Sequence, residues 1–292
     1  MIFHNTKLIN LGETEVSLFY LYCWLFFSSP RDADNLSLRF ENVCISRRGL
    51  LFYCTSFWNL QAAKHLRLVD KEQNGKGSEI AEIILYGIMK NHYKALSAIP
   101  KIFYKQNDND NAKGSDSVHI VIDPNGGFQL WLGEAKFYNS LEDARLYEPI
   151  NSVEQMLRKP IMKKECGIMT NLNELDKQIE NQTLLKKIKE CFDENTSIDE
   201  IKPKLHIPIL LLHECQITAS TTEMSDEYKN SIISFHRDRA HSFFKKQINK
   251  LSSVHKYSEI NFHLILFPVP DKTKIVNWFI SQAKNLKNDA DE

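Results

Sequence analysis

A predicted β-hairpin between residues 117 and 138 limits what this chain can fold into more than any other segment. Residues 117–123 and 129–138 are rich in β-branched, aromatic and aliphatic side chains, and the sequence Pro-Asn-Gly-Gly at 124–127 is typical of a tight turn. Alternate side chains of a strand point to the same face of its sheet. Glu134 and Lys136 are therefore predicted to project together with Leu130 and Leu132, at the end of an otherwise apolar face.

Such a face is unfavourable for charged groups unless they are paired or bind something. Asp116 precedes the first strand, and the hairpin can bring its carboxylate close to that of Glu134. Neighbouring carboxylates repel each other unless a cation neutralises them. Oxygen ligands suit Mg²⁺, with Mn²⁺ as the alternative, and the backbone carbonyl of Ala135 could add a ligand. Lys136 could orient an attacking water, so the pattern predicts a metal-dependent nuclease site. The alternative is an ordinary solvated hairpin face.

A helix is predicted from Ser78 to about residue 92, because isoleucines recur there at helical spacing after a good capping residue. Glu79 and Glu82 lie three residues apart and thus on one side of this helix. Glu79 complements the positive end of the helix dipole. Glu82 stands among apolar residues, and we favour it over Glu79 as an additional acid of the site and metal ligand.

The order of the remaining predicted elements indicates an α/β fold with a mixed sheet flanked by helices. A strand is expected at 98–106, a helix from a Ser140–Asp143 capping box toward 157, and a helical insertion at about 161–205. Strands at 208–216 and 260–269 alternate with helices at 225–251 and 273–286. Residues 1–76 form an N-terminal α+β region of unknown role, and 77–292 form the main domain. His213 is expected to be a core histidine rather than a ligand.

Composition excludes several classes of protein. Formal net charge is +0, with 37 basic and 37 acidic residues, so global charge alone cannot hold nucleic acid. The six cysteines form no Cys-x-x-Cys pair, which argues against a zinc site or a disulfide framework and favours a cytoplasmic setting. The apolar run at 16–27 is too short to span a bilayer and is expected to be a buried strand or helix. Serine-triad, phosphate-loop and dinucleotide motifs are missing from the sequence.

Three segments resemble one known family: residues 77–86 (GSEIAEIILY), 113–120 (KGSDSVHI) and 132–138 (LGEAKFY). They are similar to the HamA nuclease subunits of Hachiman anti-phage systems and to the wider restriction-endonuclease-like superfamily, named for its PD-(D/E)xK motif. The resemblance covers about residues 77–140. This chain has Ser115 before Asp116, where the superfamily name has proline.

The resemblance implies a restriction-endonuclease-like core and a Mg²⁺-dependent DNA endonuclease. It implies that Asp116 and Glu134 are metal ligands, that Lys136 is the catalytic lysine, and that Glu82 is a further acid. It also implies a superfamily-two helicase partner of the HamB type, which restrains the nuclease until infection. A stand-alone restriction or repair nuclease, and a non-cutting subunit that docks a helicase, remain as alternatives.

Overall fold

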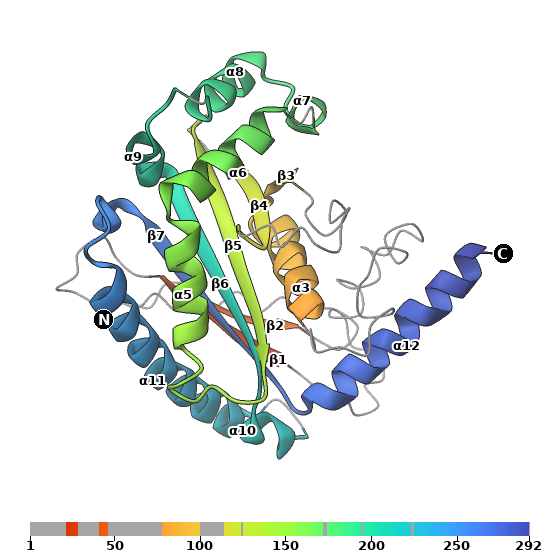
Figure 1. Cartoon of the computed structure of the whole chain (residues 1–292). Helices are drawn as coiled ribbons and strands as arrows, with labels where there is room; N and C mark the ends of the chain where they lie inside the picture. Colours follow the sequence, from red (N-terminus) through yellow and green to blue (C-terminus); the bar gives the residue numbers. More distant parts are fainter. Residues whose placement is uncertain are drawn as a thin grey trace.

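The computed structural model describes residues 22–28, 41–45, 78–99, 114–123, 125–171, 174–193, 195–222 and 225–291. Their centre is a seven-stranded sheet in the order β2-β1-β7-β6-β5-β4-β3 (Figure 1). The strands span β1 Tyr22–Ser28, β2 Glu41–Ile45, β3 Leu96–Ile99, β4 Ser117–Ile122, β5 Phe128–Tyr138, β6 Leu205–Glu214 and β7 Asn261–Val269. Strands β5, β6 and β7 are parallel to one another, whereas the outer pairings are antiparallel. The predicted α/β class with a mixed sheet is confirmed.

Helices cover both faces of this sheet (Figure 1). One layer contains α5 Tyr147–Met156, α11 Asp226–Leu251 and the helices between α5 and β6, namely α6 Lys159–Asn171, α7 Glu174–Gln178, α8 Gln182–Cys191 and α9 Ile198–Ile201. The other contains α3 Ser78–Asn91 and α12 Lys272–Asp291. The described residues also form short turns of helix at η2 Lys202–Lys204, α10 Gln216–Ala219 and η3 Tyr257–Glu259.

Alternate side chains of β5 contribute to two different buried apolar clusters, one on each face of the sheet. Leu130 and Leu132 pack with α5 and α11 residues in one buried cluster. Trp131 and Ala135 pack with α3 in a second cluster on the opposite face. Gly133 allows this close approach, since a Cβ there would lie 2.7 Å from Cδ2 of Leu85 and 2.3 Å from Oγ of Ser117.

The hairpin turn follows its prediction. The Gly126 amide donates to the Asp123 carbonyl at 2.9 Å, the Asp123 amide donates to the Gly127 carbonyl at 2.9 Å, and Gly126 has a φ of 76°. Such a positive φ is readily adopted by glycine. Ser117 faces Gly133 across the ladder, which fixes the register of the site residues beyond it.

Two expected boundaries differ from the structure. The helix predicted to start near Ser140 starts at Tyr147, because Asp143 binds α11 instead of capping a helix of its own segment. The strand predicted from Pro208 starts at Leu205 and carries the proline inside it. The helices expected at about 161–205 and both later strands are present, whereas the division of the chain at residue 77 stays a prediction. Residues 100–113, which include most of the strand predicted at 98–106, lie outside the described residues, as does most of the predicted N-terminal region.

Candidate active site

The candidate site is built on the second half of β5. This part of the strand extends past the first residue of β4, which pairs with Gly133. Glu134, Lys136 and Tyr138 occupy alternate positions and therefore share one face, the face covered by α5. On the β6 side these residues continue in parallel pairing, with Glu134 opposite Ile209 and Lys136 opposite Leu211. Pairing with β6 thus holds this part of β5 in place. Its other edge has no pairing with a residue of β4, and the site forms there.

Asp116 closes that edge. Its amide donates to the Gly133 carbonyl at 2.8 Å, and its Oδ2 accepts a hydrogen bond from the Ala135 amide, also at 2.8 Å. The carboxylate therefore takes the place of a strand carbonyl at the first position beyond β4. This hydrogen bond holds the Asp116 carboxylate beside the backbone of β5, from where its charge acts on the carboxyl group of Glu134.

Glu134 is an acid in an apolar setting, with 2% of its surface exposed. Burial, followed by the negative charge of Asp116, raises its pKa to about 7. Lys136 and a hydrogen bond with Ser152 of α5 oppose this shift. A carboxyl group with such a pKa near a second acid is typical of a functional site.

Lys136 forms an ion pair with Glu134, its Nζ lying 2.6 Å from Oε1. Burial acts to lower the pKa of Lys136, but the charges of Glu134 and Asp116 outweigh it and the pKa is raised. The ammonium form is therefore stabilised. One fifth of this side chain is exposed.

The donor atoms fit a hard divalent cation. Asp116 and Glu134 supply carboxylate oxygens, and in a strand the carbonyl of Ala135 points to the same edge as its amide, which faces Asp116. Mg²⁺ needs few protein ligands because it keeps several of its waters. Among the described residues there is no group of three or more His, Cys, Asp or Glu side chains that could hold a metal. A cation here would therefore depend on the two carboxylates and the carbonyl.

Glu82 comes from a helix rather than from the hairpin. It is buried in α3, with 7% of its surface exposed, and α3 packs against the face of β5 that carries Trp131 and Ala135. Glu134 and Lys136 project to the opposite face. Glu79 lies in the first turn of the same helix. The participation of Glu82, and our preference for it over Glu79, stay predictions.

Sequence reasoning missed three residues beside the site: Tyr138, Glu148 and Ser152. The Tyr138 hydroxyl donates to Oε2 of Glu148 at 3.0 Å. Tyr138 could have been found, because it continues the period-two series of Glu134 and Lys136. Glu148 and Ser152 reach the site from α5, whose placement depends on tertiary contacts rather than on a local pattern.

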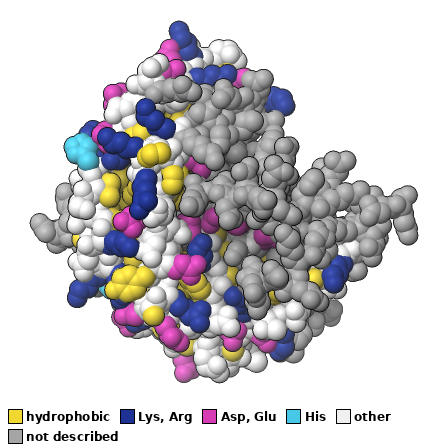
Figure 2. All heavy atoms as spheres, viewed as in Figure 1, with side chains coloured by type: hydrophobic (Ala, Val, Ile, Leu, Met, Phe, Trp, Pro, Cys, Tyr) yellow, Lys and Arg dark blue, Asp and Glu magenta, His cyan; other side chains and the backbone are white. Residues whose placement is uncertain are grey.

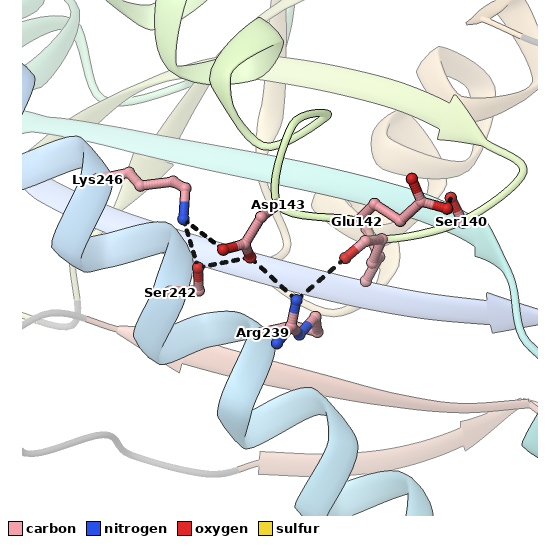
Figure 3. A network of polar contacts seen from close by, with 7 residues as sticks. Ser140, Glu142, Asp143, Arg239, Ser242 and Lys246 are labelled. Atoms are coloured by element: carbon pink, nitrogen blue, oxygen red, sulfur yellow. Dashed lines mark hydrogen bonds and ion pairs between the residues drawn. The ribbon is translucent and has the colours of Figure 1, made fainter.

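A polar network fixes the segment between β5 and α5 (Figure 3). Asp143 accepts hydrogen bonds from Arg239 at 3.0 Å, Ser242 at 2.8 Å and Lys246 at 2.9 Å, all on α11. These bonds hold the pKa of Asp143 below its ordinary value, and the hydrogen bond from Lys246 is the largest cause. Two cations of α11, Arg239 and Lys246, are thus engaged within the chain.

His213 lies in the core, as expected. It is fully buried, and its Nε2 lies 2.9 Å from Nε2 of His236, which α11 contributes. The Nδ1 of His213 lies 3.2 Å from the Glu214 carbonyl. Burial lowers the pKa of His213 to about 4, so the pair is neutral at pH 7.

Within the described part of the chain, no helix combines the length and apolarity required to cross a membrane. A search of curated proteins finds no match. The model of one family, HamA, matches residues 11–283, which include every residue of the candidate site and almost the whole chain. The chain therefore belongs to the HamA family.

Proposed function

We propose that this chain is a metal-dependent DNA endonuclease and the effector of a two-component anti-phage system. Membership of the HamA family makes it a component of Hachiman defence. The observation that carries the nuclease proposal is the convergence of Asp116, Glu134 and Lys136 where β4 begins. The order α3, β3, β4, β5, α5, β6 supports a restriction-endonuclease-like core.

Each side chain has a defined task in this proposal. Asp116, fixed by the Ala135 amide, and Glu134 would hold Mg²⁺ or Mn²⁺ together with the Ala135 carbonyl. The bound cation would acidify a water and offset charge on the phosphate. Lys136, as an ammonium, donates hydrogen bonds that orient the attacking water and stabilise the developing negative charge. Glu82 would add an acid from α3.

The balanced charge of the chain is the reason to propose a DNA-binding partner. With a net charge of +0, the chain has no overall attraction for DNA. On the face shown in Figure 2, basic and acidic side chains are interspersed. A superfamily-two helicase subunit of the HamB type would supply the DNA affinity that this surface does not provide.

The test is cleavage of plasmid DNA by the purified chain, alone and with the helicase subunit, in Mg²⁺ or in EDTA. Glu134→Gln and Lys136→Met are each expected to reduce the rate about 100-fold or more. Asp226→Asn, which breaks an exposed ion pair with Lys229, should cut as the wild type does. Cutting that the helicase leaves unchanged would favour a stand-alone nuclease. Absence of cutting with the helicase present would favour a docking subunit that does not cleave.

A further inference from the structure

The edge of β5 that faces β4 continues past Gly133, where β4 begins. At this edge the Gly133 carbonyl accepts a hydrogen bond from the Asp116 amide, and the Ala135 amide donates to the Asp116 carboxylate. Every second residue of a strand directs its backbone groups to the same edge, so the carbonyl of Phe137 faces this edge too. No described residue of β4 pairs with β5 beyond Gly133, and β4 therefore offers no amide to the Phe137 carbonyl.

Lys272, the first residue of α12, supplies a donor to this carbonyl. Its Nζ donates to the Phe137 carbonyl at 2.6 Å and lies 5.0 Å from the centre of the Phe137 ring. That ring belongs to the buried cluster that α3 covers, so the lysine reaches the strand from the face opposite Glu134 and Lys136. A hydrogen bond from an ammonium group is stronger than the bond that a strand amide would make.

The start of α12 is itself held in place by hydrogen bonds. The backbone amide of Lys272 donates at 3.1 Å to Oε2 of Glu214, the last residue of β6. Asp271 precedes the helix, and its Oδ1 accepts the amide of Lys274 at 2.9 Å. From this start α12 leads away from the sheet (Figure 1). Lys272 therefore connects three elements, because it begins α12, binds β6 through its amide and binds β5 through its side chain.

The bond to Phe137 lies next to the candidate site. Phe137 follows Lys136 directly and is two residues beyond Ala135, a separation of about 7 Å along an extended strand. We propose that Lys272 is a positioning residue: by binding this edge of β5 it keeps the Ala135 carbonyl, Glu134 and Lys136 in place for the reaction. Its effect on catalysis rests on the proposed function. Its hold on β5 does not, and it can be measured on the protein without metal or DNA.

The first test is amide hydrogen exchange of the full chain, read by mass spectrometry of peptides that cover residues 134–140 of the site strand and 207–212 of β6. Lys272→Met keeps an aliphatic side chain but removes the charge and the donor. We expect it to raise the exchange rate over 134–140 about tenfold and to leave 207–212 unchanged, because the lost bond holds only the end of β5. Lys272→Arg keeps both and should exchange as the wild type does. Lys274→Met is the matched control, since Lys274 is exposed on the same turn and pairs with Asp271.

Two results of this experiment would overturn the proposal. One is exchange over 134–140 at the wild-type rate in Lys272→Met. The other is an equal rise over 207–212, because Lys272 would then support the whole sheet rather than the end of the site strand.

The second test is kinetic, with plasmid DNA, Mg²⁺ and the helicase subunit. Lys272→Met should lower kcat roughly 10- to 100-fold and leave KM for DNA unchanged, because a small displacement of the reacting groups slows the chemistry rather than binding. Lys272→Arg should restore most of kcat. An unchanged kcat in Lys272→Met, or a change in KM alone, would overturn the positioning role. If the wild type does not cut although the exchange behaves as expected, the nuclease proposal fails while the assignment of Lys272 as the link between α12 and β5 stands.

Discussion

At the scale of single residues, the chain keeps ionisable groups where burial disfavours their charge. Glu134 is the acidic example, and the pair His213 and His236 is the basic one. The shifts have opposite consequences for stability, because burial favours the protonated carboxyl group but the deprotonated imidazole. The contribution of Glu134 to stability therefore falls as the pH rises, whereas that of the histidine pair falls as the pH drops.

Glu134→Gln should stabilise the metal-free protein increasingly as the pH rises. The pKa of Glu134 is raised in the folded state from 4.5 to about 7, so its contribution to stability is fully present below 4.5 and is lost as the pH rises through 7. Glutamine cannot ionise and avoids this loss. The difference between variant and wild type should grow by about 2 to 3 kcal/mol from pH 5 to pH 8. Urea unfolding in EDTA measures it, and a difference independent of pH would contradict the expectation.

The histidine pair should make the wild type sensitive to acid. The folded pKa of His213 is about 4 against 6.5 when exposed, so its contribution is complete above 6.5 and is lost as the pH falls toward 4. In the wild type, each histidine should contribute about 1.4 kcal/mol per pH unit to the slope of the free energy of unfolding against pH. The double change His213→Leu with His236→Phe should remove both contributions. Urea unfolding between pH 7.5 and 4.5 tests it. The exposed His241→Gln should keep the wild-type slope, and an equally steep slope in the double variant would exclude the pair as its source.

At the scale of elements, local patterns predicted what depends on neighbours in sequence. The hairpin, its turn at Gly126 and the joint projection of Glu134 and Lys136 follow from period-two alternation. The start of α5 was predicted wrongly, because Asp143 is bound by Arg239, which is 96 residues away. The contacts of Glu148 and His236 were beyond prediction for the same reason, since no local periodicity specifies which helix will cover a given face.

Gly133→Ala should loosen the packing of α3 on the hairpin. A methyl group at this position would meet Leu85 of α3 at 2.7 Å and Ser117 of β4 at 2.3 Å. Overpacking of this kind should reduce the free energy of unfolding by about 1 to 3 kcal/mol, measured by urea titration at pH 7. Combining it with Ser117→Ala should relieve only the contact with β4. Full recovery in that double variant would mean that Leu85 adapts without cost.

At the scale of the whole molecule, balanced charge limits what the chain can bind by itself. Its 37 basic and 37 acidic residues cancel, and Lys246 and Arg239 are already paired with Asp143. Affinity for DNA then has to come from a few contacts or from a second subunit.

DNA binding by the isolated chain should accordingly be weak. Without divalent cation, fluorescence anisotropy with a short duplex at 150 mM salt should give a Kd of about 10⁻⁶ M or weaker. The slope of log K against log salt should be shallower than about −4, since few phosphates are neutralised. Addition of the helicase subunit should tighten binding in the ternary assembly. Nanomolar binding by the chain alone would overturn this view of its surface.

The backbone bond made by Asp116 has a further consequence. The Asp116 oxygen that accepts the hydrogen bond of the Ala135 amide also forms the last hydrogen bond between this end of β4 and β5. Removing this side chain would therefore loosen the end of the strand as well as delete a charge. Alanine at this position would remove both the charge and the hydrogen bond to the Ala135 amide, so their effects could not be told apart. Asparagine, which keeps an acceptor for that amide, would separate the two. A site tied to its scaffold in this way tolerates little drift, because any change that shifts the strand end also shifts the acid.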